Sequence, residues 1–173
     1  MSAEPLKLNI RRARPSDRAA VMSILAATNS FRPNELLIAR EVFDDAIAKG
    51  PKGDYQSFVA EEKRNTARRA SRPAQQVGWL CFGPTPCTLG TFDIYWVVVH
   101  PRNQKCGIGS FLMQYAENLI KKRSGRMIVV DTSGSPRYLS ARRFYRSNGY
   151  RRTAGLKNFY APGDDKIIYV KCL

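Results

Sequence analysis

The chain has 173 residues, of which 43% are hydrophobic and 25% are charged. This length and composition are typical of one compact globular domain with a buried core, and they exclude a disordered or fibrous protein. We therefore expect a single domain over residues 1–173. No apolar run reaches the roughly 20 residues of a transmembrane helix, and the N-terminus lacks the apolar stretch of a signal peptide. We predict a cytoplasmic protein with no membrane partner.

The charge is strongly positive, because 29 Lys and Arg residues face 14 Asp and Glu residues, a net charge of +15. The basic residues are clustered at 11–18, at Lys63–Arg72, at Lys121–Arg126 and at Arg137–Arg152. Such a surface attracts polyanions and steers phosphorylated ligands toward the protein. Nucleic acid and a phosphorylated cofactor are both candidate partners, and the bland alternative is a solvated basic surface.

Cysteine and histidine are too few and too scattered for metal binding. The four cysteines form no CxxC pair, and His100 is the single histidine. A structural zinc site needs four such ligands at short spacings. We expect no metal and no disulfide framework, and we interpret the cysteines as buried or incidental thiols.

The first half of the chain is predicted to form strands and helices in a mixed order. Leu8–Arg12 alternates as a strand does, and Arg18–Ala27 has helical spacing after a Pro-Ser-Asp turn. A second helix is expected from about Asn34 to Lys49, with an apolar face formed by Leu37, Ile38, Val42 and Ile47. Gln56–Glu61 and Gln76–Phe82 are predicted to form a hairpin whose basic loop includes Lys63–Arg72.

The second half contains the clearest elements. Thr91–Val99 is a nearly continuous apolar run typical of a central strand, interrupted by Asp93. A helix from Gly109 follows, with Ile108, Phe111, Leu112, Tyr115 and Leu119 on one face. We then expect a strand at Met127–Asp131, a helix at Tyr138–Ser147 and a terminal antiparallel pair at Tyr150–Tyr160 and Lys166–Cys172. This order predicts an α/β (α+β) protein: a mixed, mostly antiparallel sheet of about seven strands with helices on both faces.

The segment Gln104–Gly109 lies between a strand and a helix and has the chemistry of an anion site. Glycines permit close backbone approach to a ligand, and the N–H groups at a helix start point toward an anion. Arg102 and Lys105 add positive charge. A Walker loop is excluded because GxxxxGK[ST] is absent, and a dinucleotide fingerprint fails because Leu112 occupies the third glycine position. A simple connecting turn remains the structural alternative.

Two motifs resemble a known family. Gln104, Gly107 and Gly109 match the cofactor motif [QR]xxGx[GA] of the GCN5-related N-acetyltransferase (GNAT) superfamily, and SARRFYRSNGY resembles its AxxFYxxxGF segment. The terminal NFYAPGDDKIIYVKCL resembles the tail of the ribosomal-protein N-terminal acetyltransferases. The similarity extends from about Phe92 to the C-terminus. It implies the acyl-CoA N-acyltransferase fold and an enzyme that uses acetyl-CoA as co-substrate.

The resemblance also implies roles for particular residues. The amides of the loop would bind the pyrophosphate of coenzyme A, and the backbone of the central strand would bind its pantetheine arm. The expected cofactor-binding residues are Gln104, Lys105, Cys106, Gly107, Ile108, Gly109 and Ser110, with Val97, Val98 and Val99. Many family members have an asparagine where this chain has Tyr138, so we assign that contact to Ser140 or Arg143.

Tyr145 and Asp93 are the catalytic candidates. The tyrosine of FYxxxG lies near the cofactor sulfur in the family, and a phenol of pKa about 10 stays protonated and can donate to a thiolate of pKa about 8.5. Asp93 lies eleven residues before Gln104, where histone-acetylating members carry a glutamate base. A carboxylate in an apolar strand has a raised pKa if it is desolvated, which suits a base. The alternatives are a core aromatic for Tyr145 and an amine ligand for Asp93.

Tyr95, Asp131 and Tyr160 are weaker candidates for binding the acceptor, and His100 is interpreted as structural. The predicted function is direct transfer of acetyl from the thioester to a primary amine of a protein, a peptide or a small molecule. Two alternatives stay open: a GNAT toxin that acetylates aminoacyl-tRNA, which the basic surface favours, and a non-catalytic module that binds acyl-CoA or nucleic acid. A homodimer also stays open.

Overall fold

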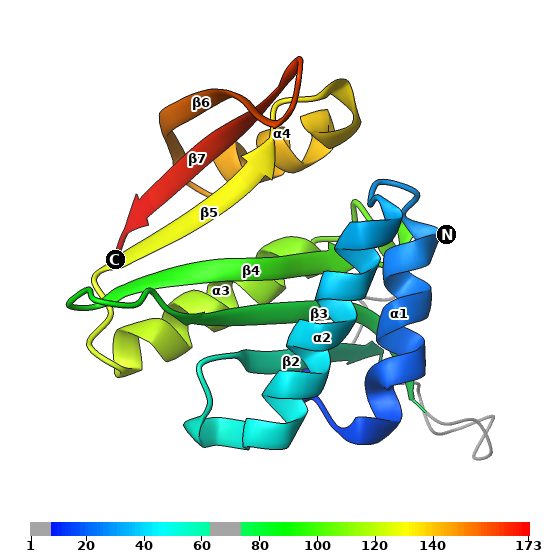
Figure 1. Cartoon of the computed structure of the whole chain (residues 1–173). Helices are drawn as coiled ribbons and strands as arrows, with labels where there is room; N and C mark the ends of the chain where they lie inside the picture. The colour runs from blue at the N-terminus through cyan, green and yellow to red at the C-terminus, as the bar shows by residue number, and fades with distance from the viewer. Residues whose placement is uncertain (1–7, 63–73) are drawn as a thin grey trace, which may run out of the picture. The chain divides into compact units, whose positions relative to one another are not determined.

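The computed structural model describes residues 8–62 and 74–173, which contain seven strands and four α-helices (Figure 1). The strands are β1 (Leu8–Arg12), β2 (Gln56–Glu62), β3 (Gln75–Pro84), β4 (Thr91–Val99), β5 (Met127–Ser133), β6 (Arg151–Ala161) and β7 (Asp164–Cys172). The helices are α1 (Arg18–Ala27), α2 (Pro33–Lys49), α3 (Ile108–Lys122) and α4 (Leu139–Ser147), and short 3-10 turns precede several of them. Among these described residues, no helix is long and apolar enough to cross a membrane.

The strands are hydrogen-bonded in the order β1-β2-β3-β4-β5-β7-β6. β1 pairs antiparallel with β2, and β7 pairs antiparallel with both β5 and β6. β4 and β5 are parallel. Their paired residues run only from Thr91, opposite Met127, to Asp93, opposite Val129, although both strands continue beyond this point. The seven-stranded sheet is therefore mixed, as the sequence predicts.

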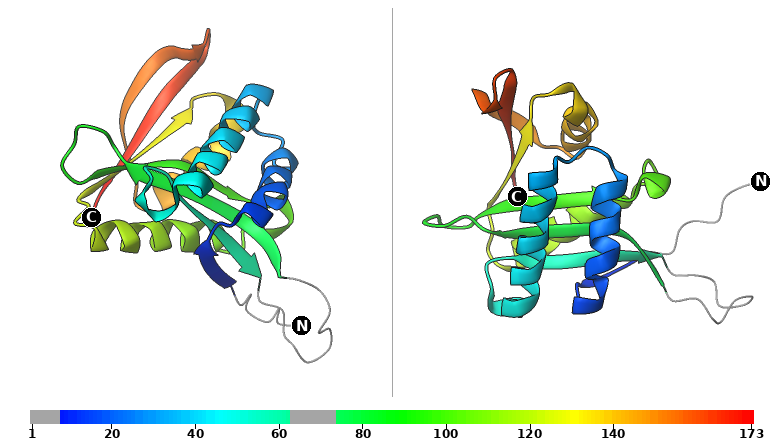
Figure 2. Two further views of the ribbon diagram at one scale, coloured as in Figure 1. Left: turned by 60° about the horizontal axis from the view of Figure 1, so that its bottom comes forward. Right: turned by 45° about the vertical axis from the view of Figure 1, so that its right-hand side comes forward.

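The chain divides into two compact units, which we describe separately. Unit 1 comprises residues 1–81 and 96–112, and unit 2 comprises residues 82–95 and 113–173, so that β3, β4 and α3 contribute to both. In unit 1, α1 and α2 lie side by side (Figure 2). Phe43 of α2 packs against the fully buried Trp79, whose ring stacks on Trp96 at 5.8 Å. These aromatic contacts bury a large apolar area at the centre of this core.

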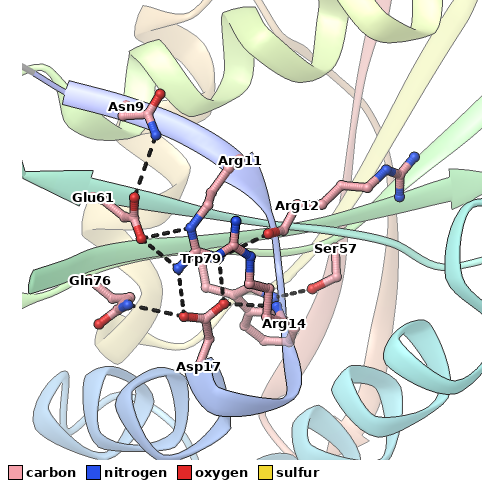
Figure 3. Close-up of polar contacts among 9 residues, drawn as sticks. All are labelled: Asn9, Arg11, Arg12, Arg14, Asp17, Ser57, Glu61, Gln76 and Trp79. Carbon is pink, nitrogen blue, oxygen red and sulfur yellow. Dashed lines mark hydrogen bonds and ion pairs between the residues drawn. The ribbon is translucent and has the colours of Figure 1, made fainter. Parts of the chain in front are cut away.

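A polar network joins β1 to the turn before α1 in unit 1 (Figure 3). Asp17 has a relative exposure of 1%, and its carboxylate accepts bonds from both Nη atoms of Arg11 at 2.7 and 2.8 Å. The amide of Arg14 and the side chain of Gln76 also donate to it, at 2.8 and 3.0 Å. Arg11 reaches Glu61 of β2 as well, through Nε at 2.7 Å. The buried carboxylate of Asp17 is tolerated because these donors bond to both of its oxygens and Arg11 balances its charge.

In unit 2, α4 and the second half of α3 cover one face of the strands β5 and β7. That face carries Ile128, Val130 and Tyr169, all nearly buried. Lys171 Nζ of β7 donates to Glu117 Oε1 of α3 at 2.8 Å. The ring of Tyr145 of α4 lies against the ring of Tyr169, with centroids 5.8 Å apart. The edge strand β6 is exposed along almost its whole length.

The predicted elements agree with the observed ones, and two helix faces differ. β1, α1 and β4 have the predicted bounds, whereas α4 begins at Leu139 because Pro136–Tyr138 forms a 3-10 turn. The predicted apolar face of α2 is wrong: Leu37 and Ile38 are each 52% exposed, and the helix buries Ala39, Phe43 and Ala46 instead. In α3, Phe111 is exposed and Met113, Ala116 and Ile120 are buried. The predicted basic loop Lys63–Arg72 lies outside the described residues.

Candidate functional site

The loop between β4 and α3, which lies in unit 1, is built to leave backbone N–H groups open. The helix begins at Ile108, and its first bond runs from the amide of Phe111 to the carbonyl of Gly107 at 3.0 Å. The amides of Ile108, Gly109 and Ser110 precede that bond, and such groups have no partner inside a helix. Residues 104–107 are exposed. An anion placed at this helix start would meet several donors and the positive end of the helix dipole.

Backbone conformation explains why glycine stands at position 107. Gly107 has φ of +81°, a conformation that other residues rarely adopt, and no atom lies within 4 Å of a Cβ built there. The space that a side chain would fill is thus open to a ligand. Lys105 also has a positive φ, of 62°. Together these two turns curl the loop, and such successive reversals form anion-binding concavities.

Gln104 and His100 hold the loop in place. The side chain of Gln104 donates to the carbonyl of Val99 at 3.0 Å, so the loop is tied back to the end of β4. His100 Nδ1 accepts from the amide of Arg102 at 3.3 Å, which supports the structural interpretation of this residue. Cys106 Sγ lies 3.5 Å from the carbonyl oxygen of Gln104, to which it donates. The side chain of Gln104 therefore helps to fix the shape of the loop.

Val97–Val99 form the end of β4 that continues past the registered pairing with β5. Val98 is nearly buried, and Val97 and Val99 are half-buried. Backbone groups of a strand without a neighbour on one side remain available for hydrogen bonds. The predicted pantetheine contact at these residues stays a prediction.

In unit 2, the structure brings two predicted carboxylates together on one face of the strands. The register places Asp93 opposite Val129, and Asp131 follows two residues later on the same strand, so both point to the same side. Thr85 Oγ1 donates to Asp93 Oδ2 at 2.7 Å. Burial raises the pKa of Asp93, nearby Asp131 raises it further, and Thr85 and Lys166 oppose the rise. The net pKa of Asp93 is raised, which makes this carboxylate a stronger base than an exposed aspartate.

Lys166 is a member of this cluster that sequence reasoning missed. It stands opposite Ser133 in the β5–β7 register and forms an ion pair with Asp131. Its ammonium also lies 4.9 Å from the ring centroid of Phe159, which itself contacts the ring of Tyr160 at 5.0 Å. The strand pairing that creates this cluster cannot be read from a local motif. Tyr95 is half-buried on the same face as Asp93, two residues along β4.

Tyr145 lies on the opposite face of the same strands. It is 8% exposed, and its ring contacts Phe144, Tyr150 and Tyr169 at centroid distances of 5.5–6.2 Å. Burial raises its pKa, so the phenol is held in the protonated form that an acid requires. Ser140 and Arg143 of α4 are exposed. Unit 2 thus presents a carboxylate on one face of β4–β7 and a neutral phenol on the other.

Metal ligands do not gather at this site. Over residues 8–62 and 74–173, no group of three or more His, Cys, Asp or Glu side chains could hold a metal ion. The four cysteines are free thiols: Cys81 is buried, and Cys87, Cys106 and Cys172 are exposed, which fits the interpretation of buried or incidental thiols.

Comparisons with known proteins agree with this geometry. Residues 53–152 match the model of the acetyltransferase (GNAT) domain family. A crystal structure from Desulfovibrio desulfuricans, assigned to the GNAT family, is 34% identical, covers 95% of this chain and 98% of its own, and has a TM-score of 0.85. No curated protein sequence matches the chain.

More distant structures share the fold. The ribosomal-protein-S18-alanine N-acetyltransferase from Escherichia coli is 17% identical, with 95% of this chain and 93% of its own covered and a TM-score of 0.69. An aminoglycoside 6′-N-acetyltransferase complexed with coenzyme A is 16% identical, with 95% and 96% covered and a TM-score of 0.68. Since the family model covers more than half of the sequence, the chain belongs to the GNAT acetyltransferase family.

Proposed function

We propose that this protein transfers an acetyl group from acetyl-CoA directly to a primary amine. The observation that carries the proposal is the strand–loop–helix of unit 1, where open helix-start amides surround the space left by Gly107. These donors, with Lys105 and Arg102, suit a pyrophosphate. Structures of the same fold have been determined with coenzyme A or acetyl-CoA, which supports the same co-substrate here. The co-substrate supplies an activated acetyl group as a thioester.

The residues of unit 2 supply the proton transfers that the reaction needs. Asp93, with its raised pKa, accepts the proton of the acceptor ammonium, so that a neutral amine attacks the thioester carbon. The new C–N bond forms as the C–S bond breaks, and Tyr145 donates a proton to the departing thiolate. Asp131 and Tyr95 lie on the face of Asp93 and bind the acceptor amine. A backbone amide near Val98 polarises the thioester carbonyl.

The test is a thiol-release assay with a panel of peptides and small amines. Tyr145→Phe and Asp93→Asn should each lower kcat by about 10²- to 10⁴-fold, which is the usual contribution of a positioned acid or base. Tyr150→Phe is the matched control, because Tyr150 belongs to the same buried aromatic cluster and bonds to Glu117 at 3.1 Å. It should leave kcat within about twofold.

Three results would overturn the proposal. Rates of Tyr145→Phe and Asp93→Asn within about twofold of the wild type would remove the acid–base assignment. Tight binding of acetyl-CoA with no thiol release from any amine would make the chain a binding module. Acetylation of the protein itself in the absence of an acceptor, seen as a mass increase, would contradict direct transfer.

A further inference from the structure

A second concave site lies in unit 2, between α4 and the hairpin β6–β7. This open pocket has a volume of about 340 Å³ and is lined by Arg142, Arg146, Arg152, Asp165, Ile167 and Tyr169. Pockets from about 300 Å³ upward can hold small molecules. Three arginines and one aspartate line it: Arg142 and Arg146 come from α4, and Arg152 and Asp165 from the hairpin. The strand register places Arg152, Ile167 and Tyr169 on the face away from Asp93.

Arg142 is fixed by the backbone rather than by an acid. Its Nη1 donates to the carbonyl oxygens of Ser133 at 2.7 Å and Ser135 at 2.8 Å. These bonds hold the guanidinium at the end of β5, and no carboxylate within residues 8–62 and 74–173 forms an ion pair with it. Because the two backbone carbonyls are neutral acceptors, they orient the Arg142 side chain but do not neutralise its positive charge.

A strand irregularity aims Arg152 into the same pocket. The β6–β7 register shifts between Arg152 and Ala154, so that Arg152 pairs with Tyr169 and Gly155 pairs with Ile167. This bulge turns two residues that are three positions apart onto one face. A Cβ on Gly155 would lie 3.1 Å from Arg152 Nη2 and 3.7 Å from Ile167 Cδ1. Glycine thus leaves room for the guanidinium to lie over the strand.

The pocket has an excess of positive charge. Among the described residues, Arg146 and Arg152 have no ion-pair partner, and Asp165 is engaged by the amide of Asn158 at 3.0 Å. Three cations and one anion leave about two positive charges over a floor of buried Ile167 and Tyr169. The three positive charges that line this pocket repel one another, and a bound dianion would relieve that repulsion. Guanidinium forks match phosphate oxygens in geometry.

We propose that this pocket binds a phosphate monoester carried by a small molecule, such as a nucleoside monophosphate or a sugar phosphate. The ligand would place its dianion among Arg142, Arg146 and Arg152 and its organic part against Ile167 and Tyr169. The convergence of the three arginines on one hollow favours a single multiply charged group, whereas an RNA backbone would need a row of cations. The site is independent of the acetyl transfer and lies on other residues than the loop of unit 1.

The test is calorimetric titration of the full chain with adenosine 5′-monophosphate, inorganic phosphate and adenosine, each with and without saturating coenzyme A. We expect the monophosphate and phosphate to bind with coenzyme A present, and adenosine to bind at least tenfold more weakly than the monophosphate (about the effect of losing a charged hydrogen-bonding group). Arg146→Gln/Arg152→Gln should raise Kd by at least about tenfold.

Arg137→Gln/Arg151→Gln is the matched control, because it removes the same charge from exposed residues of the same unit that do not line the pocket. Its Kd should stay within about threefold of the wild type, since these two charges do not line the pocket and act on it only through screening solvent. Circular dichroism checks that both double variants fold.

Three outcomes would overturn the proposal. Equal weakening in both double variants would show that general surface charge attracts the anion. Loss of monophosphate binding when coenzyme A is present would assign the signal to the co-substrate site. Binding of single-stranded RNA, lost in the pocket variant, with no binding of the small phosphates would replace it with a polyanion site.

Discussion

The chain contains two bidentate Arg–Asp pairs in unit 1 that differ mainly in burial, and this contrast permits a sharp prediction about stability. Asp17 is buried and accepts four hydrogen bonds, two of them from Arg11. Arg18 also donates two bonds to Asp44, through Nε and Nη2 at 2.7 Å each, but both side chains are close to half exposed. Asparagine at either position keeps the shape and removes the charge.

The Asp17→Asn variant should lose about 3 kcal/mol of unfolding free energy, because removing one partner of a buried ion pair costs about 3–5 kcal/mol. We take the lower end since Arg11 keeps its bonds to Glu61. The side-chain amide of the Asp17→Asn variant would also place its own N–H donors opposite those of Arg11 or Gln76, so that these groups could not bond to each other. Asp44→Asn should leave the stability almost unchanged, because exposed pairs contribute little.

Urea unfolding followed by circular dichroism measures both differences, and pH supplies a second test. Burial would raise the pKa of Asp17, but the bonds from Arg11 and the amide of Arg14 outweigh it, so the folded-state pKa is lowered. A lowered pKa contributes stability above the unfolded pKa of about 3.9 and loses it as the pH falls through the folded value. The gap between wild type and Asp17→Asn should therefore shrink below about pH 4. Equal losses at positions 17 and 44 would refute the reasoning.

Three further predictions concern the two units. Lys166→Met removes a charge that lowers the pKa of Asp93, so the acidic limb of the kcat/KM profile should move to higher pH; an unmoved limb would remove Asp93 as the titrating base. Gly107→Ala should raise the KM for acetyl-CoA severalfold with little loss of kcat, because φ of +81° strains alanine by about 1 kcal/mol; kinetics at varied acetyl-CoA measure this. Gly125→Ala should lower the thermal midpoint, because the added Cβ would lie 2.2 Å from Ile120 Cγ2. A loss of about 1 kcal/mol lowers the midpoint of a domain of this size by a few degrees, roughly 2–4 °C or more. An unchanged midpoint in calorimetry would contradict this prediction.

Local patterns carry enough information to predict most elements of this fold. Thr91–Val99 and Arg18–Ala27 have the expected bounds because apolar periodicity and flanking proline or cap residues act within a few positions. The glycine loop was likewise predictable, since its geometry depends on residues that are adjacent in sequence. The family model matches residues 53–152, which include this loop and Thr91–Val99.

Features set by strand pairing were not predictable from one sequence. Lys166 reaches Asp131 only through the β5–β7 register, which no local pattern encodes. The face of α2 was mispredicted because Leu37 and Ile38 suggest burial by residue type, whereas the helix packs through smaller Ala39 and Ala46 beside Phe43. The bulge at Thr153 is also invisible in sequence, since it arises from the pairing of two strands.

Asp93 and Tyr145 occupy opposite faces of the same strands, and this separation affects how such a protein can diversify. Along a strand, neighbouring side chains alternate between faces, so substitutions on one face leave the other largely untouched. If the face of Asp93 and Asp131 binds the acceptor, as we propose, its residues can change toward new acceptors while the aromatic packing of Tyr145 on Tyr169 is retained. One scaffold with a constant donor chemistry can in this way give rise to many acceptor specificities by mutation of a single side of its sheet.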